Sequence, residues 1–582
     1  MERGKRAVVK DLERFVAVAQ GKHPAALVVR DARIYQSFAG TFRKGDIAIE
    51  QGYIAGLGDY RGQDTIDAAG RYALPGFIDG HVHIESSLLS PAEFARAVVP
   101  TGTTTVVTDP HEIANVAGLT GIRYMMAAAE HLPLDTFFTL PSCVPATEME
   151  DSGARLTAAD LQPLLDDPRV LGLAEMMNVP GVLSGDPAVY DKLTMRRGMQ
   201  IEGHAPGLMG KELMGYAAAG ISSDHECVTA QEGQARLEAG MYLQIREGSA
   251  ARNFSALRPV INEHTAPFCM FVTDDRLPAD ILARGHINSI LKSAVEAGLP
   301  LSLAVNMATV NPARYFGLKE RGVLAPNRLA DILLFDGDGS WRPFLVLKSG
   351  IVVAREGRLL VGMPTADFPA LLKTVNIAPV SRRDLMISLP RKRAHVIGLV
   401  PHQLLTEKRV VEVKTEQGMA LADPARDILK LAVIERHHAT GRVGLGLLQG
   451  YGLQRGAIAS TVGHDSHNII VVGANDEDML TAIRELERIE GGFTIAAGGE
   501  VLASLALPIG GLMTPQDART VAEENAWLTQ TARRLGVNEE YDPLMTLAFL
   551  SLPVIPALKL TDRGLVDVLS GKILPVAAEE EI

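Results

Sequence analysis

The chain has 582 residues, of which 47% are hydrophobic and 22% are charged. These values are typical of a globular protein and exclude disordered or collagen-like chains. The formal net charge is −12, which argues against nucleic acid or an anionic membrane as the main partner, because both are bound by basic surfaces. Three cysteines without Cys-x-x-Cys spacing, a charged N-terminus without a signal-peptide core and no long apolar run predict a reduced, cytoplasmic protein without a membrane span.

The pattern of apolar and polar residues changes along the chain. An apolar stripe predicts a helix over residues 7–21. Short β-rich runs separated by Gly and Asp turns follow at 26–73, and a similar texture returns at 328–362. We therefore expect one small accessory β-domain built from both sides of a central region. Residues 1–75 would hold the N-terminal helix and the first part of this domain, and residues 321–365 the second part.

Residues 76–320 alternate short apolar runs with amphipathic helical stretches. Eight of these runs predict strands, at 77–84, 103–110, 135–142, 170–177, 199–206, 220–226, 241–248 and 268–275. Eight strand–helix repeats are the pattern of a (β/α)8 barrel of the α/β class, and a doubly wound open sheet is the competing arrangement. Nearly every predicted strand ends in His, Asp, Glu or Arg. A barrel brings these ends to one mouth, so the polar residues favour the barrel.

Residues 366–582 predict a separate C-terminal α+β domain, with β-rich runs such as HNIIVVG and long helical stretches such as DEDMLTAIRELERIE. The segment that joins it to the β-domain is short. It contains Phe368, Leu371 and Leu372 and lacks the Gly/Ser-rich or Pro-rich composition of a free linker. We expect this domain to fold against the barrel and to help close its mouth.

Potential metal ligands end several of the predicted barrel strands. His81 and His83 lie two residues apart on the first strand, so their side chains point to the same face. A lone His-x-His pair is a weak signal, but His, Glu and Asp residues end four further strands. The six candidate ligands are His81, His83, Glu175, His204, His225 and Asp274. Such a set of nitrogen and oxygen ligands suits Mn, Fe, Zn or Co, and it suffices for two ions bridged by a carboxylate.

The motifs GFIDGHVHIESS, EGHAPG, SDHE and TDD carry many of these residues in order and resemble those of the amidohydrolase superfamily. Longer strings resemble the adenine deaminase family, namely HVHIESS, TDPHEIANV and TDDRLPADILARGHIN in the barrel and ERHHATGRVGLG and TVGHDSHNIIVVG in the C-terminal region. The resemblance covers nearly the whole chain. It implies hydrolysis of a purine base, adenine, to hypoxanthine and ammonia. It also implies two divalent transition-metal ions, usually Mn or Fe, with Zn as an alternative.

The resemblance further implies roles for two carboxylates. Glu175 stands where many superfamily members have a carboxylated lysine, and a carboxylate can bridge two ions directly. Asp274 is expected to take the proton of the water that attacks C6 of the purine and to pass it to the departing amine. Asp275 competes for this role, but Asp274 ends the apolar run. Single-metal purine deaminases carry a glutamate where this chain has Gly207, so the group that protonates the ring nitrogen stays open.

Three further residues are candidates for contact with substrate. His111 and Glu112 follow the second predicted strand, and they either add a metal ligand, touch the substrate or belong to a loop turn. Arg246 ends the seventh strand, and it either positions the purine or forms a structural ion pair. His286 lies in a helical stretch, which favours a structural role.

The motif GHDSHN at 463–468 resembles a second metal site through His464, Asp465 and His467. It follows a Gly turn, which is also typical of a polar loop. We favour a loop that approaches the barrel mouth over a separate metal site.

Two other functions compete with purine deamination. A cyclic-amide hydrolase of the same superfamily would use the same metals on a different ring. A barrel without catalysis would serve as a binding scaffold, but such proteins typically lose metal ligands and all six positions are filled here. For assembly we expect a homo-oligomer, with a dimer as the first hypothesis.

Overall fold

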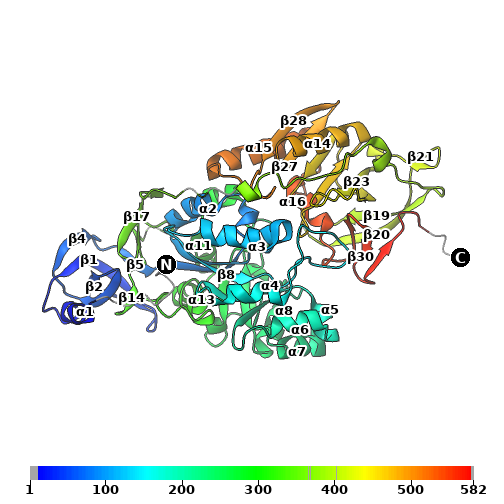
Figure 1. Cartoon of the computed structure of the whole chain (residues 1–582). Coiled ribbons are helices and arrows are strands. Elements are labelled where there is room, and N and C mark those ends of the chain that lie inside the picture. The colour runs from blue at the N-terminus through cyan, green and yellow to red at the C-terminus, as the bar shows by residue number, and fades with distance from the viewer. Residues whose placement is uncertain (1–10, 338, 365, 367–368, 402, 579–582) are drawn as a thin grey trace.

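Three parts follow one another along the molecule, with a β-rich part at one end, a barrel in the middle and the C-terminal domain at the other end (Figure 1). The computed structural model describes residues 11–337, 339–364, 366, 369–401 and 403–578. The helix predicted near the N-terminus is α1 (Leu12–Ala19), and residues 1–10 lie outside the described part.

Eight parallel strands form the central barrel, where the sequence predicted them. They are β6 (Phe77–Val82), β7 (Thr103–Thr108), β8 (Asp135–Leu140), β9 (Val170–Met176), β10 (Gln200–Gly203), β11 (Ser223–Asp224), β12 (Tyr242–Arg246) and β13 (Cys269–Val272). Neighbours in sequence pair from β6 to β10 and from β11 to β13. Backbone hydrogen bonds join the two sheets at both seams, from Asp274 to His81 at 3.0 Å and from Ser222 to Ile201 at 2.9 Å. The (β/α)8 barrel is therefore confirmed, and the strands do not form an open sheet.

Short helices follow the barrel strands. They are α2 (Pro91–Val98), α3 (His111–Ala128), α4 (Ala158–Leu161), α5 (Val179–Ser184), α6 (Pro187–Leu193), α7 (Gly210–Ala218), α8 (Ala230–Glu238), α9 (Phe254–Leu257), α10 (Pro278–Arg284), α11 (Ile287–Glu296), α12 (Leu301–Met307) and α13 (Val310–Tyr315). The sequence explains α2 locally. The Ser90 side chain accepts from the Glu93 amide and Pro91 needs no donor at the first helical position. Phe94 and Val98, four residues apart, are buried against the barrel.

The accessory β-domain is built around one sheet from two distant segments. The first segment supplies β1 (Ala25–Gln36), β2 (Thr41–Glu50), β3 (Tyr53–Gly58), β4 (Gly62–Asp67) and β5 (Tyr72–Pro75). The second supplies β14 (Arg328–Leu329), β15 (Ile332–Phe335), β16 (Leu345–Lys348), β17 (Ile351–Arg355) and β18 (Arg358–Leu359). β5 and β15 pair antiparallel, with Leu74 opposite Leu333. Ile34 and Ile332 share one buried apolar cluster, so the two β-rich segments form a single domain as their pattern predicted.

The C-terminal domain has an eight-stranded sheet with a helix on each face. Its strands are β19 (Arg393–Leu399), β20 (Thr406–Glu412), β23 (Ile428–Ile434), β24 (Val443–Gln449), β25 (Ala457–Ser460), β26 (Ile469–Gly473), β27 (Gly492–Ala497) and β28 (Glu500–Ala506). Met479 of α14 (Asp476–Arg488) clusters with Ala459 of β25, whereas Val521 of α15 (Ala518–Arg534) clusters with Ile458. Because Ile458 and Ala459 point to opposite faces of β25, the two helices cover opposite faces. The predicted α+β class is confirmed.

Shorter elements complete the C-terminal domain. They are the hairpin β21 (Thr415–Glu416) and β22 (Met419–Ala420), the helix α16 (Pro543–Ala548) and the small sheet β29 (Leu558–Thr561), β30 (Gly564–Asp567) and β31 (Lys572–Leu574).

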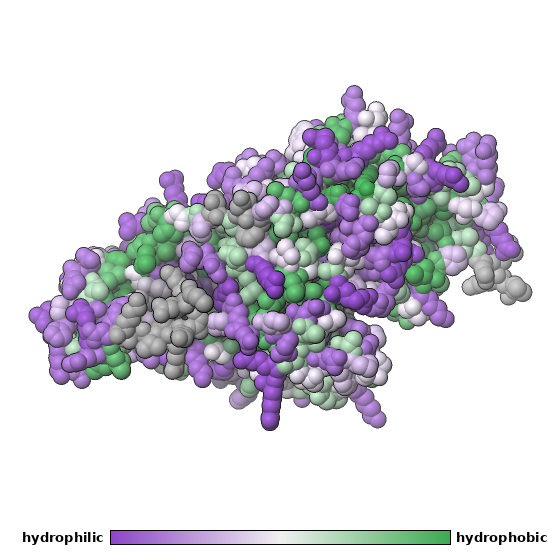
Figure 2. All heavy atoms as spheres, in the orientation of Figure 1, coloured by the Kyte–Doolittle hydropathy of each residue, from purple (hydrophilic) through white to green (hydrophobic). Residues whose placement is uncertain are grey.

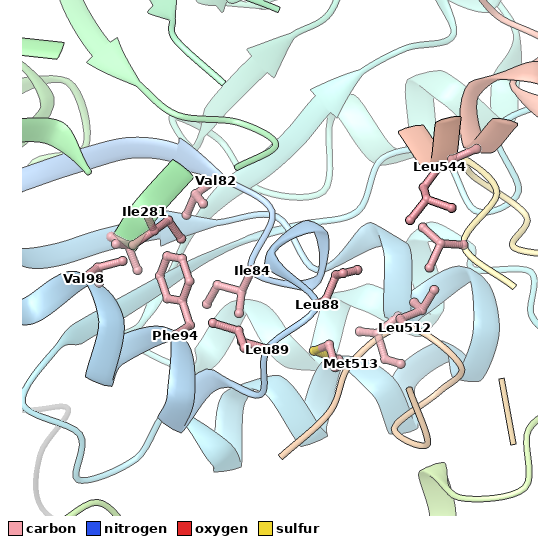
Figure 3. Close-up of a cluster of buried hydrophobic side chains, with 14 of the residues drawn as sticks. Val82, Ile84, Leu88, Leu89, Phe94, Val98, Ile281, Leu512, Met513 and Leu544 are labelled. Carbon is pink, nitrogen blue, oxygen red and sulfur yellow. The ribbon is translucent and has the colours of Figure 1, made fainter. Parts of the chain in front are cut away.

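The C-terminal domain packs against the barrel. Leu88 and Leu89, which follow the first barrel strand, lie in one buried cluster with Met513 of the C-terminal domain (Figure 3). The Ser90 amide donates to the Thr514 carbonyl at 3.0 Å, and the Thr514 amide donates to the Leu88 carbonyl at 2.9 Å. This combination of apolar and backbone contacts holds the domain in place, as expected from the short connecting segment.

Of the apolar residues in the connecting segment, which we expected to pack against the protein, only part can be checked. Leu371 is fully buried, Leu372 is 42% exposed, and Phe368 lies outside the described residues. The visible face of the molecule is largely hydrophilic, with apolar residues scattered over it (Figure 2). None of the described helices has the length and apolar character needed to cross a membrane.

Candidate metal centre

The six predicted ligands meet at the carboxyl ends of the barrel strands. His81 lies on β6 and Glu175 on β9, and the other four follow the ends of their strands directly or within two residues. All six side chains are buried, none more than 8% exposed: His81, His83, Glu175, His204, His225 and Asp274. The barrel therefore places four imidazoles and two carboxylates in one enclosed volume.

One half of this cluster contains His81, His83 and Asp274. The Nε2 atoms of the two histidines lie 3.2 Å apart, and Asp274 Oδ1 is 3.3 Å from the first and 3.2 Å from the second. The Nδ1 atom of His83 donates to the Asp109 carbonyl at 3.1 Å. A carbonyl can only accept, so the neutral ring keeps its Nε2 lone pair directed at the cluster, as a metal ligand requires.

The other half is organised by Glu175. Its Oε2 atom is 3.0 Å from Nδ1 of His204 and 3.0 Å from Nε2 of His225. Its Oε1 atom is 3.6 Å from Nε2 of His83, so one carboxylate reaches both halves. Burial acts to raise the pKa of Glu175, but His204 and His225 outweigh it and hold this pKa well below its usual value. Glu175 is therefore an ionised carboxylate that contacts histidines of both halves.

Arg246 is buried beside Asp274 and Glu226 and is not exposed at the barrel mouth. Its NH1 atom donates to Asp274 Oδ2 at 2.8 Å and to Glu226 Oε1 at 2.6 Å. Burial acts to raise the pKa of Asp274, but Arg246 and the nearby imidazoles outweigh it and hold this pKa well below its usual value. In this structure Arg246 forms the buried ion pair that was one of its two expected roles, and its contact with purine stays a prediction.

A second group of His and Glu side chains joins the barrel to the C-terminal domain. We call Glu112, His464 and His467 the interface cluster. His464 Nδ1 lies 2.7 Å from Glu112 Oε1, and His467 Nε2 bonds to Glu112 Oε2. The Gly463 amide donates to His467 Nδ1 at 3.2 Å, so Nε2 carries the proton and donates it to Glu112. Burial lowers the pKa of His467 to about 4, which keeps its ring neutral.

His464 is held differently within the interface cluster. Burial acts to lower its pKa, but Glu112 outweighs burial and raises it to about 9. The GHDSHN segment thus lies against Glu112 at the start of α3, as the loop that we favoured from the sequence would. Whether the interface cluster binds a metal stays a prediction.

His111 connects the two clusters. Its Nδ1 atom is 2.9 Å from Asp109 Oδ2 and 3.5 Å from Glu175 Oε1, and its Nε2 atom is 3.9 Å from Asp465 Oδ1. His111 begins α3 and is buried, so it is not part of an exposed loop turn. Its participation in metal or substrate binding stays a prediction, as does that of Glu112.

Comparison with known proteins agrees with this site. The Amidohydrolase family matches residues 72–381, and the Adenine deaminase C-terminal domain matches residues 403–572. "Adenine deaminase 2" of Carboxydothermus hydrogenoformans is 52% identical over 98% of this chain and 100% of its own length. "Adenine deaminase" of Nitratidesulfovibrio vulgaris (strain DP4) is 52% identical over 96% of this chain and 97% of its own. The chain belongs to the adenine deaminase family.

Among solved structures, L-hydantoinase (dihydropyrimidinase) of Arthrobacter aurescens matches with a TM-score of 0.44 and 15% identity, over 58% of this chain and 98% of that one. As a member of the amidohydrolases, this adenine deaminase relative binds divalent metal. The residues fit such ions. Beyond the inward lone pair of His83, one ring nitrogen of each of His81, His204 and His225 lies within 4.0 Å of Glu175 Oε2.

Asp275 and His286, two further residues weighed in the sequence, lie near the cluster and near the barrel strands respectively. Asp275 accepts from the Ser86 hydroxyl at 2.5 Å, whereas Asp274 contacts the histidine pair. His286 precedes α11. It contacts Thr103 Oγ1 on β7 at 2.9 Å and Asp79 Oδ2 on β6 at 3.3 Å, so it joins two barrel strands.

The sequence analysis missed two carboxylates of this adenine deaminase family site. Glu226 Oε1 lies 3.6 Å from His204 Nδ1 and 3.5 Å from His225 Nε2. Glu202 Oε1 lies 3.4 Å from His81 Nδ1 and accepts from Gln244. The signals were present, because Glu226 directly follows His225. Glu202 lies two residues before His204, the spacing that puts strand side chains on one face.

Proposed function

We propose that this chain hydrolyses adenine to hypoxanthine and ammonia in the six-ligand cluster at the barrel mouth. The observation that carries the proposal is the complete cluster in a chain that is 52% identical, over 98% of its length, to a protein named adenine deaminase. The names of the curated relatives favour this reaction over cyclic-amide hydrolysis. The filled ligand set disfavours a scaffold without catalysis.

We assign His81, His83 and Asp274 to one ion and His204 and His225 to a second, with Glu175 between them. The support is the pairwise closeness of these atoms and the inward lone pair of His83. Divalent ions in such a site supply a water acidic enough to act as hydroxide near neutral pH. For the metal we propose Mn or Fe, with Zn as the alternative, because nitrogen and carboxylate donors suit all three.

Asp274 is the proton carrier in this proposal. Arg246 holds its Oδ2 atom in place at 2.8 Å, while Oδ1 faces His81 and His83. Ionised, Asp274 can accept the proton of the attacking water and deliver it to the amine that leaves C6, so that water and adenine become hypoxanthine and ammonia. The enclosed position of the cluster limits competing contacts with bulk water.

The test is ammonia release from adenine by the purified chain, with metal content measured on the same sample. Release of one ammonia per hypoxanthine, from protein with close to two transition-metal ions per chain, supports the proposal. Absence of turnover with fully loaded protein contradicts it. A dihydropyrimidine is assayed in the same experiment, and its hydrolysis would indicate a cyclic-amide hydrolase.

Assembly and location are also proposed here. We propose a homodimer of the cytoplasm, and the three cysteines, all buried and unpaired, agree with a reducing compartment. Light scattering behind size exclusion gives the mass, and cell fractionation gives the location.

A further inference from the structure

The segment Gly463–Asn468 of the C-terminal domain lies against the start of α3 in the barrel. It connects β25 to β26, two central strands of the eight-stranded sheet. The His464 ring stacks on Phe549 at a centroid distance of 4.3 Å and an angle of 14°. His467 bonds to Glu112 on the barrel side. Anchored at both histidines, the segment gives the residues between them a fixed position.

Asp465 lies between these anchors and is only 2% exposed. Its Oδ1 atom is 3.9 Å from His111 Nε2, beyond direct hydrogen-bond reach. Its Oδ2 atom is buried and has no hydrogen-bond donor among the described residues. A buried carboxylate oxygen without a donor is costly, so such an atom calls for a ligand that brings one.

The position of Asp465 relative to the metal ligands defines what kind of donor would fit. His111 Nδ1 is 3.5 Å from Glu175 Oε1, so a single imidazole ring separates Asp465 from the bridging carboxylate. If a planar heterocycle lies with its amine-bearing carbon at the cluster and its long axis toward Asp465, its far ring reaches this carboxylate. In adenine that far ring is an imidazole with one N–H, which is the donor that Asp465 lacks.

We propose that Asp465 is a specificity-determining residue, which accepts a hydrogen bond from the imidazole N–H of the purine. This inference rests on the proposed function. The C-terminal domain thereby supplies part of the substrate site in addition to covering it. Burial raises the pKa of Asp465 to about 6, against the effect of His111, so the group is still mainly an ionised acceptor at neutral pH.

The experiment compares Asp465→Ala and Asp465→Asn with the wild type in the full, metal-loaded chain. Ser466→Ala is the matched control, because it alters the same segment without touching His111. We expect Asp465→Ala to raise KM for adenine about 10- to 100-fold, as the loss of a hydrogen bond to a charged group does. Asp465→Asn keeps a neutral acceptor and should give a smaller rise, and Ser466→Ala should stay within about twofold.

A binding measurement without turnover completes the test. Calorimetry measures the dissociation constant of hypoxanthine, which keeps the imidazole N–H, and of 7-methyl- and 9-methylhypoxanthine, which lack it; none of the three carries the amine that is hydrolysed. Asp465→Ala should weaken hypoxanthine binding as much as it raises KM, and should change methylhypoxanthine binding little. Metal content should stay at the wild-type value.

Three results would overturn the inference. They are an unchanged KM and hypoxanthine affinity in Asp465→Ala, a loss of bound metal, or an equal loss of affinity for all bases. If Asp465→Ala does not fold, Asp465→Asn decides by the same criteria. Failure of the proposed function is distinct, because the wild type would then release no ammonia from adenine.

Discussion

The metal cluster and the interface cluster use the same residue types and differ in where their protons point. In the metal cluster, two imidazole Nε2 atoms face each other at 3.2 Å, and a backbone carbonyl takes the outer proton of His83. In the interface cluster, a backbone amide occupies the outer nitrogen of His467, so its proton faces Glu112. The first arrangement offers the His83 lone pair to a cation, whereas the second offers the N–H of His467 to a carboxylate. The partner of the outer ring nitrogen separates these two histidines.

Among the substitutions that test this difference between the clusters, we expect the largest effect from Asp274→Asn, and we expect it on catalysis. Asp274→Asn should lower kcat for adenine by about 10²–10⁴-fold, because it removes a proton carrier, with a further loss if a metal ligand is disturbed. Steady-state kinetics with metal analysis measures both. Asp275→Asn is the matched control and should lose far less. Near wild-type activity in Asp274→Asn would transfer the role to Asp275.

Next in size is the effect of Glu112→Gln on stability. Glutamine keeps one acceptor oxygen but faces the other imidazole with an NH2 donor and removes the negative charge, so the change should cost about 3–5 kcal/mol of unfolding free energy. Thermal or denaturant unfolding measures the loss. Glu148→Gln alters an exposed ion pair with Arg155 and should change little. Loss of bound metal in Glu112→Gln without loss of stability would contradict the distinction between the clusters.

The pH dependence of the interface cluster gives a somewhat smaller effect. The folded-state pKa of His464 is about 9, above its ordinary value of 6.5, so folding is favoured by protonation. The stabilisation is fully present below pH 6.5 and is lost as pH rises through 9, up to about 3 kcal/mol in all. The stability difference between wild type and Glu112→Gln should therefore shrink over this range. A difference that grows with pH would show that His464 is neutral.

The last test is metal removal. Chelation takes away ligands that bind only the folded state, at a cost of about 3 kcal/mol for each ion held at a hundredfold excess over Kd. Differential scanning calorimetry of loaded and chelated protein measures it. If the interface cluster is complete without an ion, chelation should shift the unfolding temperature of wild type and of Glu112→Gln equally. A smaller shift in the variant would place an ion at Glu112.

Prediction from sequence succeeded where a local pattern determines the structure. All eight barrel strands were located, because each is a short apolar run that ends in a polar residue. The convergence of the six candidate ligands followed from their places at strand ends. Glu226 was missed, since only packing shows that the residue after His225 turns toward the same histidines. The direction of Arg246 and the docking of His467 on Glu112 depend on contacts between distant segments, which no spacing reveals.

The antiparallel pairing of β5 with β15 has a consequence for synthesis of the chain. Leu74 and Leu333 are partners in one sheet, and the entire barrel is inserted between them. Early strands such as β1 and β2 can pair as soon as they leave the ribosome, and β5 can pair with β1, but the other edge of β5 has no partner until the barrel and β15 have been translated. The accessory β-domain therefore begins to form first and is completed after the barrel. Pairing of β15 with β5 then brings the two ends of the barrel segment next to each other.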